Sequence, residues 1–204
     1  SKENDEDFPE SKVQILHKKL DMRYGENPHQ MAAFYVEKDY PSSSLSNFSQ
    51  LHGKALSFNN LNDADNAWEC VKSFDKPTCV IVKHANPCGV CSSDTVKDAY
   101  LGAFATDRTS AFGGIISFNK QVDEETASLI IKQFSEVIIA PSFSTKAIEL
   151  LKQKGNLRLL VVPLGQDKDM YDYKKISGGL LVQSIDNHKI NIDDCQIVSK
   201  AKPS

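Results

Sequence analysis

CVIVKHANPCG, at residues 79–89, is the stretch that decides the fold. Its first four residues form a continuous, largely β-branched apolar run, which is typical of a strand covered on both faces. The run stops at Lys83-His84, and the Asn, Pro and Gly that follow predict a tight loop. We therefore expect a buried strand that ends in a loop carrying reactive side chains.

Strand-like and helix-like segments alternate on both sides of this stretch. Strand candidates lie at residues 32–36, 79–82, 114–118, 137–140, 157–162 and 179–182, and helical candidates at 61–71, 92–104, 124–134 and 144–154. Strands that alternate with helices of about 10 to 15 residues favour a largely parallel sheet with helices on both faces. The pattern predicts an α/β fold in three layers, α/β/α.

Composition excludes two classes of partner. The chain has 204 residues, of which 40% are hydrophobic and 25% charged, and its apolar runs are only a few residues long. A membrane span, which needs about 20 apolar residues, is therefore not expected. The 24 Lys and Arg against 27 Asp and Glu give a net charge of −3 without a basic cluster, which argues against a nucleic-acid partner.

The amino terminus and the cysteines indicate the compartment. Residues 1–10, SKENDEDFPE, are acidic and polar, and predict a flexible tail without the basic and then apolar regions of a secretory signal. The five cysteines, an odd number, are interpreted as free thiols in a reducing compartment. We expect a cytoplasmic protein whose folded part spans residues 11–204.

Lys83 and His84 are the first candidates for chemistry, because ligands of parallel α/β sheets bind beyond the carboxyl ends of the strands. His84 can move a proton near neutral pH, and a neighbouring ammonium can stabilise developing negative charge. Adjacent strand residues point to opposite faces, so both can serve one site only where the chain bends. A solvated Lys83 beside a structural His84 is the alternative that this pattern leaves open.

Arginine occurs only at positions 23, 108 and 158, and Arg23 opens the unusual segment RYGENPHQ, residues 23–30. Its Arg, Tyr, His and amide side chains around Gly and Pro suggest contact with a ligand. A rigid hydrogen-bonded turn with Arg23 in a salt bridge is the competing interpretation. Further along, Gly113 and its neighbour Gly114 provide the backbone freedom that close approach of a ligand requires.

A zinc site is the second hypothesis for the loop after residue 82. Zinc deaminases combine H-x-E with P-C-x-x-C, and here Cys88 and Cys91 follow His84. Asn86 stands where the catalytic Glu would be, and the three would-be ligands share one loop instead of two segments. We therefore expect no metal, and small structural thiols at the two cysteines.

Six motifs in this order resemble the AICAR transformylase/IMP cyclohydrolase family, bifunctional enzymes of purine biosynthesis. They are RYGENPHQ at 23–30, FNNLNDADNAW at 58–68, KHANPCG at 83–89, SAFGG at 110–114, EVIIAP at 136–141 and SGGLLVQ at 177–183. The resemblance implies transfer of a formyl group from the co-substrate 10-formyltetrahydrofolate to the 5-amino group of AICAR, giving FAICAR. The intact protein would then close FAICAR to IMP. A cytidine deaminase-like fold without zinc is also implied.

The resemblance carries roles to individual residues. His84 would accept the proton of the attacking amine, and Lys83 would assist charge development at the formyl group. Arg23 and Tyr24 match nucleotide-binding residues, with Arg23 suited to the phosphate. Further substrate contacts are implied for Asn60, Gly113 and Glu136.

The resemblance covers the amino-terminal lobe of the transformylase region. The cyclohydrolase domain and the second transformylase lobe, with most folate contacts, would lie outside this chain, and the family's site forms across a homodimer. We therefore expect this chain alone to be inactive or nearly so. The alternatives are a non-catalytic nucleotide-binding or structural lobe and, less favoured, a zinc-dependent deaminase-like hydrolase.

Overall fold

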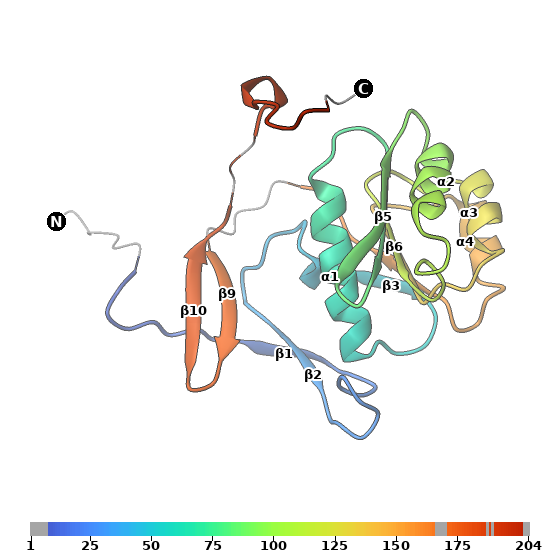
Figure 1. The fold of residues 1–204 in the computed structure, drawn as a ribbon. Helices are drawn as coiled ribbons and strands as arrows, with labels where there is room; N and C mark the ends of the chain where they lie inside the picture. Colours follow the sequence, from blue (N-terminus) through green and yellow to red (C-terminus); the bar gives the residue numbers. More distant parts are fainter. Residues whose placement is uncertain (1–7, 166–170, 187, 189, 202–204) are drawn as a thin grey trace. The chain divides into compact units, whose positions relative to one another are not determined.

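The buried strand at the centre of the sequence pattern is β4 (Thr78–Lys83), an interior strand of a six-stranded sheet. The structure, a computed structural model, describes residues 8–165, 171–186, 188 and 190–201 (Figure 1). The chain divides into two units, Ser1–Asp167 and Lys168–Ser204, and the large sheet belongs to the first.

The large sheet is mixed, which corrects the expectation of a largely parallel one. Only the pairings of β6 with β7 and of β7 with β8 are parallel, whereas β4 runs antiparallel to both of its neighbours and β3 runs antiparallel to β8. The order across the sheet is β3 (Ser49–His52), β8 (Arg158–Val161), β7 (Val137–Ala140), β6 (Ile115–Phe118), β4 and β5 (Asn86–Ser92).

The segment after β4 forms a β-hairpin, whereas the sequence predicted a loop that leads to a helix. Residues 86–92 pair antiparallel with β4 from Lys83↔Asn86 to Thr78↔Ser92, with a register shift between Ile81 and Val82. Pro and Gly are poor residues for an interior strand, but they are tolerated in an edge strand or at a bulge. β5 is an edge strand, and its pairing with β4 contains a register shift. The hairpin turn consists of His84 and Ala85.

Helices cover both faces of the sheet, as the apolar pattern predicts (Figure 1). On one face α1 (Phe58–Lys72) packs Ala64, Trp68 and Val71 against alternate residues of the strands, such as Val80 and Val82. The other face buries the remaining strand residues under α2 (Val96–Thr106), α3 (Glu124–Ile130) and α4 (Thr145–Leu151). The three-layer α/β/α arrangement is confirmed.

Two predicted strands belong to small separate hairpins. The segment at 32–36 is β2 (Ala33–Val36), which pairs with β1 (His17–Asp21). The segment at 179–182 is β10 (Gly179–Ser184), which pairs with β9 (Tyr171–Ile176) in the second unit. Short 3-10 turns occupy Leu45–Asn47 and Ile192–Asp194. The tail expected at 1–10 lies mostly outside the described residues, which begin at residue 8.

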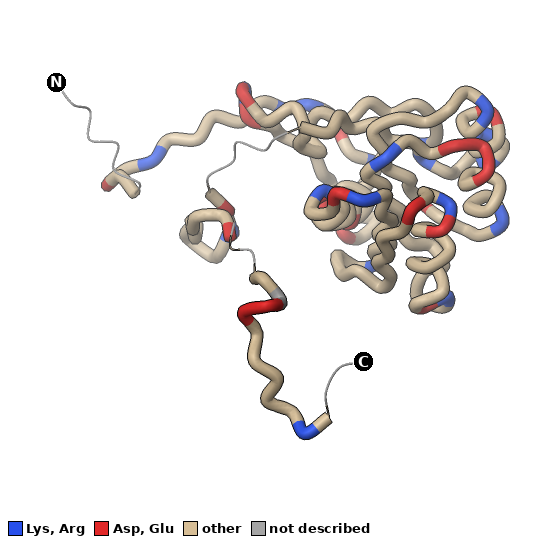
Figure 2. Tube along the Cα trace, turned by 90° about the horizontal axis from the view of Figure 1, so that it is seen from above, with Lys and Arg blue, Asp and Glu red and all other residues tan. Residues whose placement is uncertain are grey.

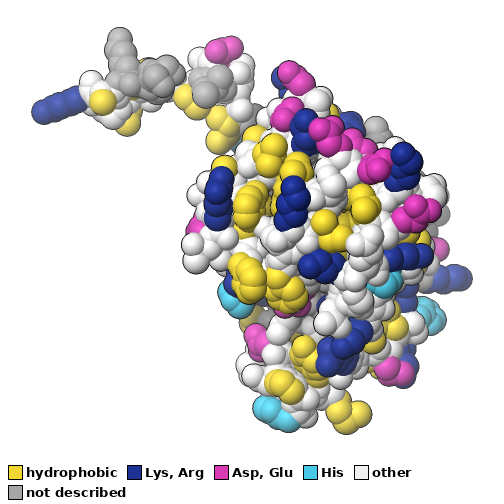
Figure 3. Space-filling model, turned by 90° about the vertical axis from the view of Figure 1, so that its right-hand side faces the viewer, with side chains coloured by type: hydrophobic (Ala, Val, Ile, Leu, Met, Phe, Trp, Pro, Cys, Tyr) yellow, Lys and Arg dark blue, Asp and Glu magenta, His cyan; other side chains and the backbone are white. Residues whose placement is uncertain are grey.

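Charges of both signs are interspersed along the described chain (Figure 2). On the side of α2, α3 and α4, apolar side chains are mixed with Lys, Arg and acidic groups (Figure 3). Of the helices in the described ranges, none combines the length and apolar character needed to cross a bilayer.

Candidate functional site

The β4–β5 turn places Lys83 and His84 at one end of the sheet. His84 and Ala85 have φ values of 54° and 60°, a left-handed conformation that two-residue hairpin turns of type I′ require and that Asn-Gly normally supplies. Asp63 of α1 holds this turn, because its carboxylate accepts the backbone N–H of His84 at 3.3 Å and of Ala85 at 2.8 Å. The helix thus fixes a backbone that these residues adopt at a cost of about 1–3 kcal/mol each.

Lys83 is held toward the neighbouring loop. Its Nζ donates to the backbone carbonyl of Phe112 at 2.8 Å, immediately before Gly113. Gly113 has a φ of 75°, and its N–H donates to the carbonyl of Phe134 at 2.9 Å. A Cβ at this position would lie 3.3 Å from the Phe134 ring, so both the backbone angle and the space favour glycine.

The start of α1 supplies Asn60. Ser57 caps the helix in a reciprocal capping box, in which Asn60 Oδ1 accepts the Ser57 N–H at 3.1 Å. The amide of the same buried side chain donates through Nδ2 to Glu136 Oε2 at 2.8 Å. Since Glu136 immediately precedes β7, this contact joins the helix cap to the beginning of a sheet strand.

The RYGENPHQ segment is both a rigid turn and part of the site. Gly25 N–H donates to the Gln30 carbonyl at 2.8 Å, which closes the turn, and the Arg23 N–H donates to the Leu56 carbonyl at 2.9 Å. The salt bridge that the competing interpretation gave Arg23 is not found among the described residues, which place no carboxylate within 4 Å of its guanidinium. Instead, that guanidinium lies 5.4 Å from the centre of the Tyr24 ring.

These segments enclose a pocket of about 480 Å³. This volume is within the range of small-molecule sites. Six of the seven predicted site residues line it: Tyr24, Asn60, Lys83, His84, Gly113 and Glu136. The seventh, Arg23, lines an adjoining hollow of about 210 Å³, which shares Tyr24 and Glu136 with the pocket.

The pocket lies at the amino ends of β6 and β7, and not beyond the carboxyl ends of parallel strands as the sequence analysis expected. Gly113 and Glu136 precede these two strands, while Lys83 ends a strand that runs in the opposite direction. The antiparallel placement of β4 therefore brings Lys83 and His84 to the edge where β6 and β7 begin. The hairpin turn also supplies the bend that lets both side chains line one pocket.

Arg158 is a residue of this region to which the sequence analysis gave no role. It begins β8, is only 6% exposed, and lines the hollow with Arg23 and Lys54. Burial lowers the pKa of its guanidinium, the charge of Arg23 lowers it further, and the charge of Glu136 opposes both effects. The rarity of arginine was the one sequence signal that could have drawn attention to it.

Comparison with known proteins identifies the family. Residues 1–204 match the family described as AICARFT/IMPCHase bienzyme, over the whole chain. The chain belongs to this family. Its members combine a folate-dependent AICAR transformylase with an IMP cyclohydrolase and act in purine biosynthesis.

A solved structure shares a limited similarity with this AICARFT/IMPCHase chain. It is described as a formate dehydrogenase accessory protein from Desulfotalea psychrophila, with 12% sequence identity and a TM-score of 0.36. The alignment covers 42% of this chain, which spans 43% of the length of that protein. A similarity of this extent carries no information about function.

The cysteines of this family member do not line the pocket. Cys88 donates through Sγ to the Ile81 carbonyl at 3.5 Å, and Cys91 packs against the apolar core under α2. Burial raises the pKa of the Cys88 thiol and, more strongly, that of Cys79. Among the described residues, no three His, Cys, Asp or Glu side chains gather as metal ligands would.

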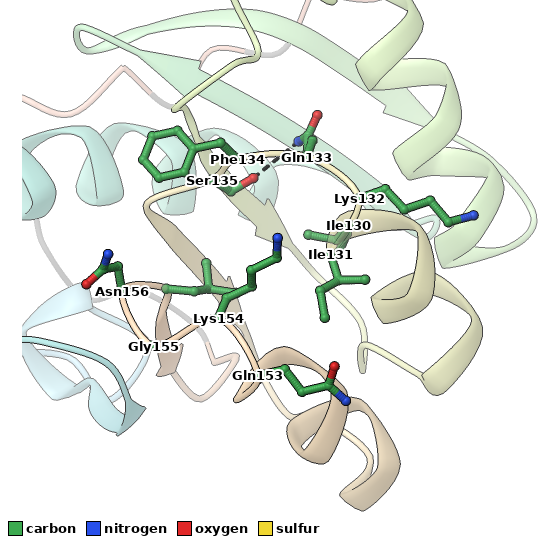
Figure 4. Close-up of a pocket in the computed structure, with 11 residues that line it drawn as sticks. Ile130, Ile131, Lys132, Gln133, Phe134, Ser135, Gln153, Lys154, Gly155 and Asn156 are labelled. Atoms are coloured by element: carbon green, nitrogen blue, oxygen red, sulfur yellow. Dashed lines mark hydrogen bonds between the residues drawn. The ribbon is translucent and has the colours of Figure 1, made fainter.

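A second hollow of about 320 Å³ lies where α3 and α4 lead into the next strands (Figure 4). Its lining comes from residues 130–135 and 153–157 and is mostly apolar or amide in character. Gln133 donates to Ser135 Oγ at 3.2 Å within it, and the Phe134 ring points away from the Lys132 side chain. None of the seven predicted site residues lines this hollow.

Proposed function

We propose that this chain forms the AICAR side of a formyl-transfer site. The observation that carries the proposal is the convergence of a proton acceptor, an ammonium, a carboxylate and two guanidinium groups on two hollows that share Tyr24 and Glu136. His84 and Lys83 line the pocket of about 480 Å³, called the larger hollow from here on. Arg23 lines the adjoining hollow of about 210 Å³, called the smaller hollow. The two hollows correspond to the two ends of a nucleotide, which has a reactive base at one end and a phosphate at the other.

His84 is suited to act as the general base. In the part of the chain that the structure describes, neither of its ring nitrogens has a hydrogen-bond partner, and the side chain is exposed to the pocket. The amine of an aminoimidazole carboxamide is a weak nucleophile, so removal of its proton as the new bond forms contributes about 10²–10⁴ in rate. The turn held by Asp63 would keep the imidazole in place.

Lys83 is suited to stabilise the negative charge that develops on the formyl oxygen. One of its three N–H groups is anchored at Phe112 O, which orients the ammonium and leaves two donors for a substrate. The co-substrate 10-formyltetrahydrofolate supplies the formyl group. In the balanced step the amine nitrogen bonds to the formyl carbon and its proton passes to His84; the bond from that carbon to the folate nitrogen then breaks, and the departing nitrogen takes up a proton, which returns His84 to its neutral form.

Asn60 and Glu136 would position the sugar. The Glu136 carboxylate lies between the two hollows and accepts from Asn60, so it is restrained and has further acceptor capacity for ribose hydroxyls. Gly113 would allow the substrate to approach the backbone closely. Arg23 would then face the phosphate.

The proposal includes parts of the enzyme beyond this chain. The second transformylase lobe would supply most folate contacts, the homodimer would complete the site, and the intact cytoplasmic protein would convert FAICAR to IMP. The cytidine deaminase-like classification of the lobe belongs to the same proposal. This chain by itself would bind AICAR without appreciable turnover.

The test measures FAICAR formation by this chain supplemented in trans with the second transformylase lobe. We expect activity from the mixture and a loss of more than about a hundredfold with His84→Ala, while His17→Ala, an exposed histidine of β1, serves as the matched control. Calorimetry with AICAR separates binding from catalysis. AICAR binding by an inactive mixture would instead favour the non-catalytic nucleotide-binding lobe, and unchanged turnover of the His84 variant would refute its role as base.

A further inference from the structure

Three basic residues line the smaller hollow. Arg23, Lys54 and Arg158 line it together with Tyr24 and Glu136. Arg23 and Lys54 are exposed, whereas Arg158 is 6% exposed. A buried cation beside a second cation is unfavourable unless a counter-ion compensates, so this arrangement requires a physical explanation.

Arg158 is held rigidly by backbone carbonyls. Its Nε–H is shared between Lys54 O at 3.1 Å and Ala55 O at 3.3 Å, Nη2 donates to Ala55 O at 3.2 Å, and Nη1 donates to Asn156 O at 3.4 Å. An arginine has five N–H groups. These bonds therefore leave one N–H on each terminal nitrogen without a partner among the described residues.

The charge of Arg158 also lacks a close counter-ion in the described part of the chain. No Asp or Glu oxygen lies within 4 Å of its guanidinium, and the same holds for Arg23. Glu136 is near enough to attract Arg158, but its Oε2 already accepts from Asn60. Two arginines of like charge thus line one hollow, and each guanidinium has N–H groups without a hydrogen-bond partner among the described residues.

We propose that Arg158 is a substrate-positioning residue that binds, together with Arg23, the phosphate of a nucleotide monoester seated in this hollow. A phosphate dianion brings up to two negative charges and several acceptor oxygens, which matches two forked guanidiniums and the ammonium of Lys54, a third basic lining residue. The inference rests on the proposed function for the identity of the nucleotide. The anion site itself follows from the charges of the hollow alone.

Glu136 helps to set which end of the nucleotide lies in which hollow. This residue lines both hollows, so its charge disfavours a phosphate in either, but only the smaller hollow has Arg23, Lys54 and Arg158 to compensate, and the carboxylate can accept hydrogen bonds from neutral ribose hydroxyls. The backbone links the same groups, because Arg158 N–H donates to the Glu136 carbonyl at 3.1 Å and Arg23 N–H donates to the carbonyl of Leu56, next to Ala55. Arg158 therefore holds the segment 54–56, to which the backbone of Arg23 is hydrogen-bonded, as well as lining the hollow.

The small number of arginines makes the inference directly testable. Nε–H resonances of the ¹⁵N-labelled chain arise from Arg23, Arg108 and Arg158 alone, and single Arg→Lys variants assign them. The chain is titrated with inorganic phosphate, with AICAR and with the nucleoside that lacks the phosphate. We expect phosphate and AICAR to shift the Arg23 and Arg158 resonances, Arg108 to stay unchanged, and the nucleoside to leave the Arg158 resonance in place.

Affinity provides the second readout. Arg158→Lys is expected to weaken AICAR binding about tenfold or more, because lysine cannot form the forked contact, and to change nucleoside binding by less than about twofold. Arg108→Lys is the matched control. If this arginine only supported the fold, the variant would weaken both ligands equally, and that result would overturn the inference; so would an Arg158 resonance that stays fixed during the phosphate and AICAR titrations of the unmodified chain.

The experiment separates this inference from the proposed function. If inorganic phosphate shifts Arg23 and Arg158 while AICAR leaves the His84 ring signals unchanged, the anion site stands and the formyl-transfer site fails. If AICAR shifts His84 and Arg23 but not Arg158, the assignment of Arg158 fails and the proposed function stands. The unmodified chain gives both answers even where Arg158→Lys does not fold.

Discussion

Replacing Asp63 with Ala removes the acceptor that holds the turn between β4 and β5. Its two hydrogen bonds, to Ala85 N–H at 2.8 Å and His84 N–H at 3.3 Å, restrain two non-glycine residues in the left-handed region. A bond to a charged acceptor contributes about 1.5–3 kcal/mol, and we assign the shorter bond the lower end of this range and the longer one about 0.5 kcal/mol. The expected loss in free energy of unfolding is about 2 kcal/mol.

For a chain of this length, such a loss lowers the thermal midpoint by about 4–8 °C. In the reconstituted enzyme, the released turn would spend less time with His84 facing the pocket, and about 2 kcal/mol corresponds to up to about thirtyfold in that population. Turnover should therefore fall about tenfold or more. Calorimetric unfolding, FAICAR formation and hydrogen exchange at the Ala85 amide measure the three effects.

Two further variants make this reasoning refutable. Asn66→Ala changes an exposed side chain on the same helix and should leave stability and activity nearly unchanged. Ala85→Gly relieves one left-handed residue, so it should restore about 1 kcal/mol to Asp63→Ala. An Asp63→Ala protein with an unchanged midpoint and an equally protected Ala85 amide would show that the turn does not depend on this carboxylate.

Four other variants, one of them a control, test the packing and the ionisation of buried groups. Gly89→Ala places a Cβ 2.1 Å from a backbone carbonyl of α2 and should cost more than about 2 kcal/mol in chemical denaturation, whereas Gly155→Ala meets nothing within 4 Å and should be neutral. Burial raises the pKa of Tyr100 in the folded state, so the neutral tyrosine contributes its full stabilisation below the unfolded pKa of about 10, and this stabilisation is lost as the pH rises further. Tyr100→Phe should therefore reduce the fall of the thermal midpoint at alkaline pH. Asn60→Asp sets a second carboxylate against Glu136, so the variant should be less stable at pH 7 than at pH 4, and a loss independent of pH would contradict that contact.

The hydrophobic pattern predicted the elements that are buried, because burial on both faces leaves a continuous apolar run. The strands around Ile81, Ile116 and Ile138 and the N-cap Ser144 lie where the sequence indicates. The helix predicted at 124–134 ends at Ile130, since the chain turns there to reach β7. The apolar pattern of a single segment is enough to identify such an element, even when its neighbours in the sheet are not known.

Strand direction and the hairpin could not be predicted in the same way. The turn residues His84 and Ala85 lack the Asn-Gly signature, and Pro87 argues against a strand unless that strand is known to lie at an edge. Edge position is a property of the whole sheet. The same limit applies to Arg158, whose buried surroundings come from carbonyls about 100 residues earlier in the chain.

The position of β5 has a consequence for how this protein behaves at high concentration. An exposed edge strand can recruit a strand from another molecule, and proline and bulges are features that prevent such growth. Pro87 has no N–H to donate, and the register shift opposite it interrupts the ladder. We therefore expect the hairpin that presents His84 also to disfavour addition of a strand from another molecule, and a substitution that makes β5 a more regular strand to favour aggregation.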